Sequence, residues 1–353
     1  MYKRALALAL GAAFAAAAPA HAQSTNVTIY GLMDAGVEYI NHANATDASQ
    51  VRVISGGKNT SRWGLRGSED LGGGLKAVFN LEGGILLDTG NADGALFKRQ
   101  ANIGLEGGFG RVVIGRSFTT TYDLVIQFDP MGFAPNYSWA TSGPATGPSK
   151  YGMTTAFDNL VKYTYKKDGV MVGATVGLGE QNTAQEGRKY AVGGAYKFGK
   201  LNTMLSYEAI NGVNVAATGR HDEISAIHAG ADYRDGKWRV AAGLRSYKLV
   251  SGKAATADVK ADTTWAGVSY MPAPYTITGA VYHVNVKNVA SGQDADPTMI
   301  VARVMKALSK RTDLYLSVAH VSSKNGKLTG LSRDDAGFAD TQTGITAGIQ
   351  HRF

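Results

Sequence analysis

The sequence predicts an all-β fold, a sixteen-stranded antiparallel β-barrel that crosses a membrane. Three observations lead to this prediction: unusual composition, a strict alternation of apolar and polar residues, and an alternation of short turns with long loops. The 353 residues include 45 glycines and 17 tyrosines, and only 18% are charged, whereas soluble domains average about 25%. After residue 22, no run of 18 apolar residues is available to form a spanning helix.

Residues 27–39 illustrate the alternation. Val27, Ile29 and Val37 fall on one face of this segment, and Thr28 and Asp34 fall on the other. A period of two places successive side chains on opposite faces of a strand, so one face is apolar and the other is mixed polar. The same period recurs in residues 62–68, 75–82, 161–166, 238–245 and 345–353.

Short turns and long polar stretches separate the predicted strands. Gly, Pro and Asp-Gly pairs, which tight hairpins need, mark seven turns, at residues 71–74, 108–110, 168–169, 199–200, 235–236, 272–274 and 309–311. Eight longer stretches lie near residues 41–58, 88–95, 117–156, 179–188, 210–223, 250–261, 288–297 and 323–340. These fifteen connections imply sixteen strands, each about 10 residues long, which is enough to cross a bilayer when tilted.

The physics of the bilayer favours closure of the sheet. Every backbone N–H and C=O group in lipid needs an internal partner, and a closed barrel supplies one for each. Sixteen strands also leave an aqueous lumen, so few large aliphatic residues are needed. A soluble β-sandwich is the alternative, but sixteen alternating strands that continue to Phe353 favour the barrel.

Residues 1–22 are expected to form a cleaved signal peptide. Lys3 and Arg4 precede an apolar stretch over residues 5–18, and Ala20-His21-Ala22 has the small-x-small pattern of a cleavage site. The alternative is a buried N-terminal helix. Removal of this segment leaves residues 23–353 as the barrel domain and lowers the formal net charge from +8 to +6, because two basic residues are lost.

Several motifs are specific enough to suggest a family. Residues 27–31 are Val-Thr-Ile-Tyr-Gly, and residues 61–77 are Ser-Arg-Trp-Gly-Leu-Arg-Gly-Ser-Glu-Asp-Leu-Gly-Gly-Gly-Leu-Lys-Ala. Together with residues 97–100, 109–110, 114–116 and 348–353, these motifs resemble the general porins of Gram-negative bacteria, especially those of β-proteobacteria. The resemblance covers residues 23–353. It implies a trimeric, sixteen-stranded diffusion channel of the outer membrane, with the third loop folded into the lumen.

The third long stretch, residues 117–156, is expected to be packed rather than exposed. Loops of this length in compact domains tend to be functional. The segment contains four prolines, Pro130, Pro135, Pro144 and Pro148, and its aromatic residues include Phe128, Phe133, Tyr137 and Trp139. Proline stiffens the chain and aromatic rings pack, so the alternative of an ordinary surface loop is less favoured.

The resemblance also implies a pore constriction between this loop and basic residues on the barrel wall. Arg62 and Arg99 fall at two of the wall positions, and Asp123 and Asp129 are the acids of the loop. The third wall position falls near Ala156, where no base is present, so Lys150 and Lys162 are the candidate substitutes. Further charges expected to face the lumen are Asp34, Glu38, Arg66, Lys76, Lys98 and Arg116.

A channel with more basic than acidic charge at its narrow part is expected to prefer anions weakly. Charges that face each other across water also orient dipolar solutes. The predicted function is therefore passive diffusion of small hydrophilic solutes and ions. The alternatives are a substrate-specific porin and, less favoured, an outer-membrane barrel enzyme or a soluble periplasmic sugar-binding β protein.

Other functions have little support in the sequence. Residues 147–150, Gly-Pro-Ser-Lys, form only a broken phosphate-binding motif. There is no cysteine and no His-x-x-x-His pair, so no metal or cofactor is expected. We see no convincing nucleophile–His–acid set, and basic residues are spread along strands rather than clustered, which argues against nucleic acid.

The expected partners follow from the resemblance. They are two further copies of the chain in a homotrimer, outer-membrane lipid with lipopolysaccharide, and the barrel-assembly machinery. Phe353 ends an alternating strand, and in barrels of this family such a residue is the assembly signal.

Overall fold

A computed structural model describes residues 25–140, 153–181, 185–290, 292, 294–325, 328–332 and 337–353. The expected signal peptide, residues 1–22, and Lys150 lie outside the described residues. The strands are β1 (Thr25–Ile40), β2 (Gln50–Ser55), β3 (Arg62–Gly72), β4 (Leu75–Gly84), β5 (Gln100–Gly107), β6 (Gly110–Phe118), β7 (Ala156–Lys167), β8 (Val170–Gly177), β9 (Lys189–Phe198), β10 (Leu201–Asn211), β11 (Glu223–Asp235), β12 (Trp238–Val250), β13 (Val259–Tyr270), β14 (Tyr275–Lys287), β15 (Thr298–Ala307), β16 (Thr312–Ser322) and β17 (Thr341–Arg352). A short helix, α2 (Thr120–Val125), follows β6.

The strands form one closed antiparallel barrel. Each strand pairs with its neighbours, and the sheet closes where β1 pairs with β17, from Leu32 opposite Arg352 to Ile40 opposite Gly344. β2 and β3 share one position, because β2 pairs with the second half of β1 and β3 with the first half. Seventeen strand segments therefore fill sixteen positions, which confirms the predicted fold.

One predicted loop is partly wrong. The alternation predicts a loop over residues 41–58, but residues 50–55 form β2 and continue the line of β3. The chain advances seven residues from Ser55 to Arg62, whereas β1 advances only three, from Ala35 to Leu32. Six residues, 56–61, therefore lie opposite two residues of β1, and they leave the line of the strand as a short loop that we call the strand break.

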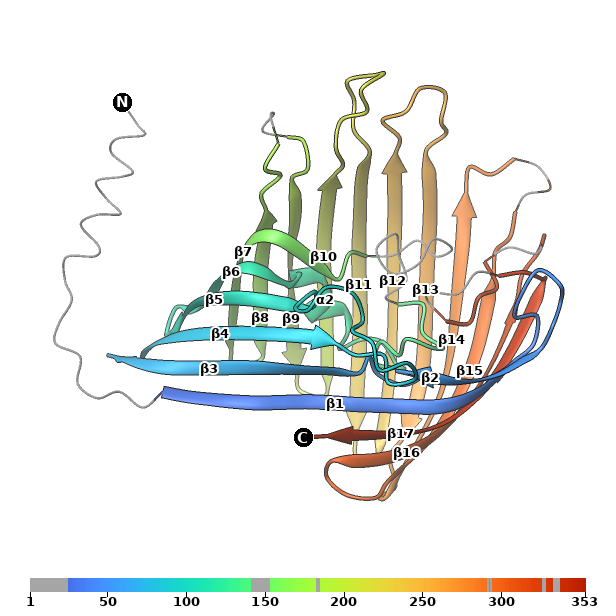
Figure 1. The fold of residues 1–353 in the computed structure, drawn as a ribbon, viewed down its shortest axis with the longest axis horizontal. Coiled ribbons are helices and arrows are strands. Elements are labelled where there is room, and N and C mark those ends of the chain that lie inside the picture. The colour runs from blue at the N-terminus through green and yellow to red at the C-terminus, as the bar shows by residue number, and fades with distance from the viewer. Residues whose placement is uncertain are drawn as a thin grey trace.

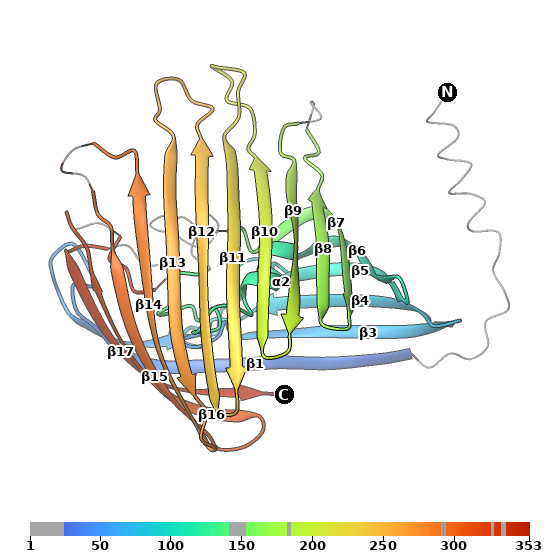
Figure 2. The ribbon, with the colours of Figure 1, turned by 180° about the vertical axis from the view of Figure 1, so that it is seen from behind.

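The two ends of the barrel differ. Every predicted short turn joins two consecutive strands, the first between β3 and β4 and the last between β15 and β16. The long connections between β8 and β15 lie at the opposite end from the short turns (Figures 1 and 2).

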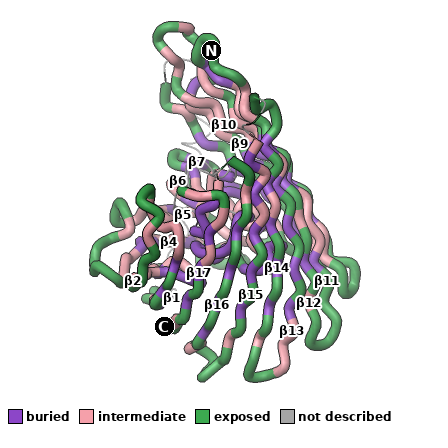
Figure 3. Tube along the Cα trace, turned by 90° about the vertical axis from the view of Figure 1, so that its right-hand side faces the viewer, coloured by how far each residue is buried: buried purple, intermediate pink, exposed green. Residues whose placement is uncertain are grey.

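The outer face of the barrel is apolar and the inner face is polar. Val27, Ile29 and Val37 are more than half exposed, whereas Asp34 and Glu38 are at most 1% exposed. Figure 3 shows this alternation as exposed and buried positions along β11–β16. Among the described residues, no helix is long and apolar enough to cross a bilayer. The apolar outer face is the surface that lipid solvates in a transmembrane barrel.

The main apolar core lies inside the barrel. We call residues 119–155, which connect β6 to β7, loop 3. Its buried side chains pack against the inner wall from β8 to β16, and the largest of those involved are Leu124, Phe128, Phe133, Tyr137 and Trp139 from loop 3 and Met204, Trp265, Tyr282 and Met299 from the wall. Figures 1 and 2 show α2 within the barrel outline from both sides. The prediction that this loop folds into the lumen is confirmed.

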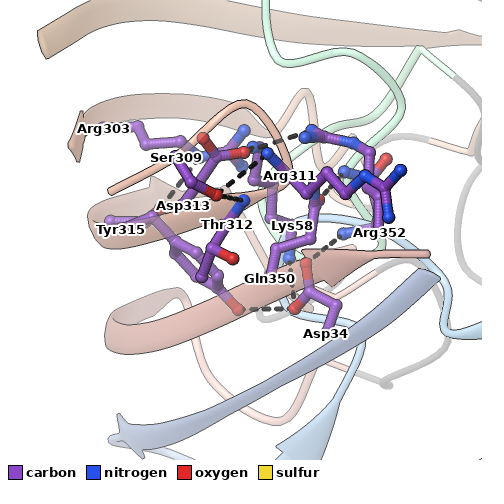
Figure 4. A network of polar contacts seen from close by, with 12 residues as sticks. Asp34, Lys58, Arg303, Ser309, Arg311, Thr312, Asp313, Tyr315, Gln350 and Arg352 are labelled. Carbon is purple, nitrogen blue, oxygen red and sulfur yellow. Dashed lines mark hydrogen bonds and ion pairs between the residues drawn. The ribbon is translucent and has the colours of Figure 1, made fainter. Parts of the chain in front are cut away.

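The strand break makes polar contacts at the barrel seam, the junction of β1 and β17 where the sheet closes (Figure 4). The Asp34 carboxylate of β1 accepts hydrogen bonds from the backbone N–H of Asn59, at 3.0 Å, and from the Tyr315 hydroxyl, at 2.7 Å. Lys58 Nζ lies 3.2 Å from Asp313 on β16. The break therefore connects the first strand to the penultimate one beneath the β1–β17 junction.

The contact between Gly31 and Phe353 at this seam leads to a prediction about the stability of the barrel. The backbones of Gly31 and Phe353 exchange two hydrogen bonds of 3.1 Å. A Cβ at Gly31 would lie 2.3 Å from the Phe353 ring and 2.9 Å from the Arg62 carbonyl oxygen. Gly31→Ala should therefore destabilise the barrel by about 1–3 kcal/mol, seen as a lower temperature at which the folded band disappears in unboiled gel electrophoresis.

The matched control is Gly279→Ala on β14. A Cβ there meets no atom within 4 Å, so the melting of the folded band should change little. Equal shifts in the two variants would contradict the importance of the Gly31–Phe353 contact. The role of Phe353 as an assembly signal stays a prediction.

Candidate functional site

An open cavity of about 380 Å³ lies between loop 3 and the wall formed by β3 to β6. We call it the arginine cavity. Four basic side chains line it from the wall side: Arg62, Lys98, Arg99 and Arg116. Five residues line it from loop 3: Tyr122, Ile126, Gly132, Phe133 and Thr155.

Local backbone features bring the wall arginines together. Arg62 begins β3 directly after the strand break, and Arg99 comes just before β5. Arg116 lies at an irregularity between Gly115 and Ser117, where the register of β6 against β7 shifts. These three positions come from different strands, so their proximity depends on the barrel rather than on sequence spacing.

Glu82 on β4 holds two of the guanidinium groups near each other. Arg99 Nε donates to Glu82 at 2.7 Å, and Arg62 Nε lies 3.9 Å from the same carboxylate. The Tyr30 hydroxyl also donates a hydrogen bond of 2.7 Å to the Glu82 carboxylate. A shared carboxylate reduces the repulsion between two like charges, because each guanidinium gains an opposite charge nearby.

The remaining two basic residues also have acidic partners. Lys98 Nζ lies 2.6 Å from Asp93. Arg116 pairs with Asp158 at 2.5 Å, and its Nε donates to the carbonyl oxygen of Lys98. The ion pairs fix the positions of the basic side chains while leaving them on the cavity surface.

Neither of the two loop acids, Asp123 and Asp129, lines this cavity. Asp123 pairs with Lys162 at 2.5 Å, and Lys162 also donates to the Phe118 carbonyl oxygen at 2.8 Å. Asp123 and Lys162 line a neighbouring cavity of about 510 Å³. Lys162, a candidate for the third wall position, therefore pairs with the loop, and Arg116 lines the arginine cavity instead.

Asp129 is an internal residue of loop 3. Its side chain is fully buried and accepts hydrogen bonds from the backbone N–H groups of Met131, at 3.1 Å, and Phe133, at 2.6 Å. The hydroxyls of Ser138 and Tyr282 donate to the same carboxylate. Its predicted role as a charge on the pore water stays a prediction, and this burial does not favour it.

Two further acids predicted to face the lumen bind backbone or loop groups. Asp34 holds the strand break, as described above. Glu38 on β1 accepts hydrogen bonds from Asn136 at 2.7 Å and from Tyr137 at 3.1 Å, and it pairs with Arg52 at 2.7 Å. Burial and the Glu38 carboxylate raise the pKa of the Tyr137 hydroxyl, so this loop side chain stays a donor.

The predicted lumen bases Arg66 and Lys76 lie nearer the short turns. They line a cavity of about 380 Å³ with Arg111 and Glu106. Positive side chains therefore continue from the arginine cavity towards the short-turn end.

A second set of arginines was missed by sequence reasoning. These arginines donate to backbone carbonyl oxygens of loop 3: Arg239 to Gln127 at 2.7 Å, Arg245 to Ala140 at 2.7 Å, and Arg303 to Met131 at 3.2 Å. Alternation along β12 and β15 indicates which side chains point inward. It does not indicate that these side chains anchor a loop.

A closed barrel with a charged lumen and a loop folded across it defines a membrane channel. The profile of the Gram-negative porin family matches residues 5–326. The outer membrane porin protein 32 of Delftia acidovorans is 34% identical over 377 residues, which covers 100% of both chains. An outer membrane porin protein of Bordetella pertussis is 36% identical over 250 residues, or 63% of each chain.

A solved structure agrees with these relatives. The anion-selective porin from Comamonas acidovorans superposes with a TM-score of 0.80 at 28% identity, covering 94% of this chain and 100% of that one. The chain belongs to the Gram-negative porin family, as its motifs predicted. It is an outer-membrane protein that forms a diffusion channel.

Loop 3 should lose its single docked position when Asp129 is removed. Asp129→Ala leaves two backbone N–H groups and two hydroxyls without their acceptor, at about 1–3 kcal/mol for each buried group. We expect single-channel recordings to show several conductance levels instead of one. Asp123→Ala is the control, because that side chain is partly exposed and has one ion pair, so its recordings should keep one level. A single, unchanged level in Asp129→Ala would contradict this role.

Proposed function

We propose that the protein is a general porin with a weak preference for anions, set by the basic side chains of the arginine cavity. The observation that carries the proposal is the unequal distribution of charge in that cavity, whose charged side chains all lie on the wall side. Four bases and one acid, Asp93, line its wall side, whereas the described part of loop 3 contributes only uncharged residues, namely Tyr122, Ile126, Gly132, Phe133 and Thr155. The name of the Comamonas relative, an anion-selective porin, agrees with this direction.

The preference is expected to be modest. Glu82, Asp93 and Asp158 pair with the four bases, which leaves an excess of one positive charge around the cavity. Water in a wide channel screens this charge, since the Debye length is about 8 Å at physiological salt.

Basic side chains nearer the short turns extend the positive electrostatic potential of the arginine cavity along the lumen. Arg66, Lys76 and Arg111 line one cavity with Glu106, and Lys166 lines the adjoining one. A lumen surface of one predominant sign raises the local concentration of counter-ions and so favours anion entry.

The assembly state is also part of the proposal. A homotrimer in lipid and lipopolysaccharide, exported by a signal peptide at residues 1–22 and inserted by the barrel-assembly machinery through Phe353, is what the family resemblance implies. The apolar outer face supports burial against lipid or a neighbouring barrel. We propose a channel without catalytic activity, with residues 23–353 as the barrel domain.

A substrate-specific porin is the second candidate function. The observation in its favour is the aromatic character of loop 3 beside the bases, where Tyr122 and Phe133 line the cavity. A specific channel would show saturable flux for one class of solute, whereas a general channel would not.

The selectivity proposal predicts the effect of a double substitution, Arg62→Ser with Arg99→Ser. One unit charge about 8 Å from a permeating ion contributes about 0.5 kcal/mol in water, and salt screening reduces this to about 0.2 kcal/mol. Removal of two positive charges favours the cation and disfavours the anion, so the difference between them changes by about 0.8 kcal/mol. The cation-to-anion permeability ratio should therefore rise about fourfold, measured as the reversal potential in a salt gradient across a planar bilayer.

The control removes the same charge elsewhere. Lys237→Ser with Lys253→Ser changes two exposed lysines in the connections after β11 and β12, and should leave the reversal potential unchanged. Cation preference in the unmodified channel would overturn the proposed sign. An unchanged reversal potential in the double arginine variant would place the selective region elsewhere.

A further inference from the structure

We propose that the arginine cavity is a binding site for flat, aromatic carboxylates, and that the channel passes these anions in preference to non-planar carboxylates of equal charge. This inference rests on the proposed anion preference and specifies the class of anion. It depends on the juxtaposition of a basic wall with a cluster of aromatic rings.

The aromatic side of the cavity is a continuous cluster of three rings. Phe118 and Tyr122 are stacked, with ring centroids 4.3 Å apart and planes inclined by 17°. Phe133 meets Tyr122 edge-on, with a centroid distance of 5.3 Å. All three residues line the arginine cavity. We call them the aromatic cluster.

The basic side directly adjoins this cluster. The Arg99 guanidinium carbon lies 5.2 Å from the centroid of the Phe118 ring, within the range of a cation–π contact. Arg62 and Arg116 line the same cavity. A small molecule in the cavity can therefore contact a guanidinium group and an aromatic ring together.

The cluster is held in place by the loop backbone. Thr119 caps α2, and its hydroxyl oxygen accepts a hydrogen bond of 3.0 Å from the Tyr122 N–H. The Phe133 N–H donates to Asp129, as described above. Fixed rings lose little conformational freedom when a ligand binds, which favours binding.

The loop acids do not oppose a carboxylate in this cavity. Asp123 is paired with Lys162, and the Asp129 carboxylate is buried within the loop. A carboxylate would bind one of the wall guanidinium groups, whose planar donors match its two oxygens. An attached flat ring would lie against Tyr122 and Phe118, since aromatic pairs prefer offset-stacked or edge-to-face contacts.

The test compares two carboxylates of the same charge and similar size, benzoate and cyclohexanecarboxylate. The full channel is placed in planar bilayers, and permeability ratios to chloride are taken from reversal potentials. We expect the benzoate ratio to exceed the cyclohexanecarboxylate ratio about threefold, the factor that one aromatic contact provides. Benzoate should also reduce the chloride current at lower concentration than cyclohexanecarboxylate.

Variants of the cluster separate binding from a purely structural role. Tyr122→Leu should abolish the difference between the two carboxylates while chloride-over-potassium selectivity is retained, and Tyr122→Phe should keep both. If Tyr122→Leu changes the chloride conductance, Phe118→Leu provides the same comparison from the neighbouring ring. Retention of the benzoate preference in a leucine variant with normal chloride conductance would overturn the inference.

The outcomes for the unmodified channel distinguish the two proposals. Equal ratios for benzoate and cyclohexanecarboxylate in an anion-selective channel would overturn the aromatic site and leave the proposed function intact. A channel that prefers potassium to chloride would overturn the proposed function itself.

Discussion

The position of loop 3 is the constraint on which the rest of the lumen depends. Ordering a chain segment costs about 1–2 kcal/mol per residue in backbone entropy, so a loop of this length needs many compensating contacts. Its aromatic side chains pack against the wall from β8 to β16, and buried Asp129 organises its turn. Because the loop packs on the wall from β8 to β16, its other side faces β3 to β6 across the arginine cavity.

The inner wall uses arginine in two ways, and the partner of each side chain decides which. Arg245 and Arg303 donate to backbone carbonyl oxygens and are buried. Arg62 and Arg99 share a carboxylate and remain on a cavity surface. The first kind satisfies backbone groups that would otherwise be buried without donors, whereas the second kind supplies an electric field to solutes.

Much of the fold was predictable because turn chemistry and alternation are local signals. The sixteen strand positions follow from them, but β2 was missed because Val51 and Val53 lie within a polar stretch. The burial of Asp129 was not predictable, since Tyr282 is 153 residues away. Arg116 was expected to face the lumen, but its place beside Arg62 and Arg99 depends on an irregular register.

The strand break has a consequence for the order of folding. Lys58 and Asp313 are 255 residues apart, and Asp34 and Tyr315 are 281 residues apart. Contacts of such sequence separation form slowly, because the intervening chain must first be brought together. The intervening strands pair with the strands next to them in the sequence, so they can add to the sheet one after another. The contacts of the break with β1 are local, since Asn59 and Asp34 are 25 residues apart. The contact between Lys58 and Asp313 can form only when the last strands are in place, so it reports that the barrel has closed.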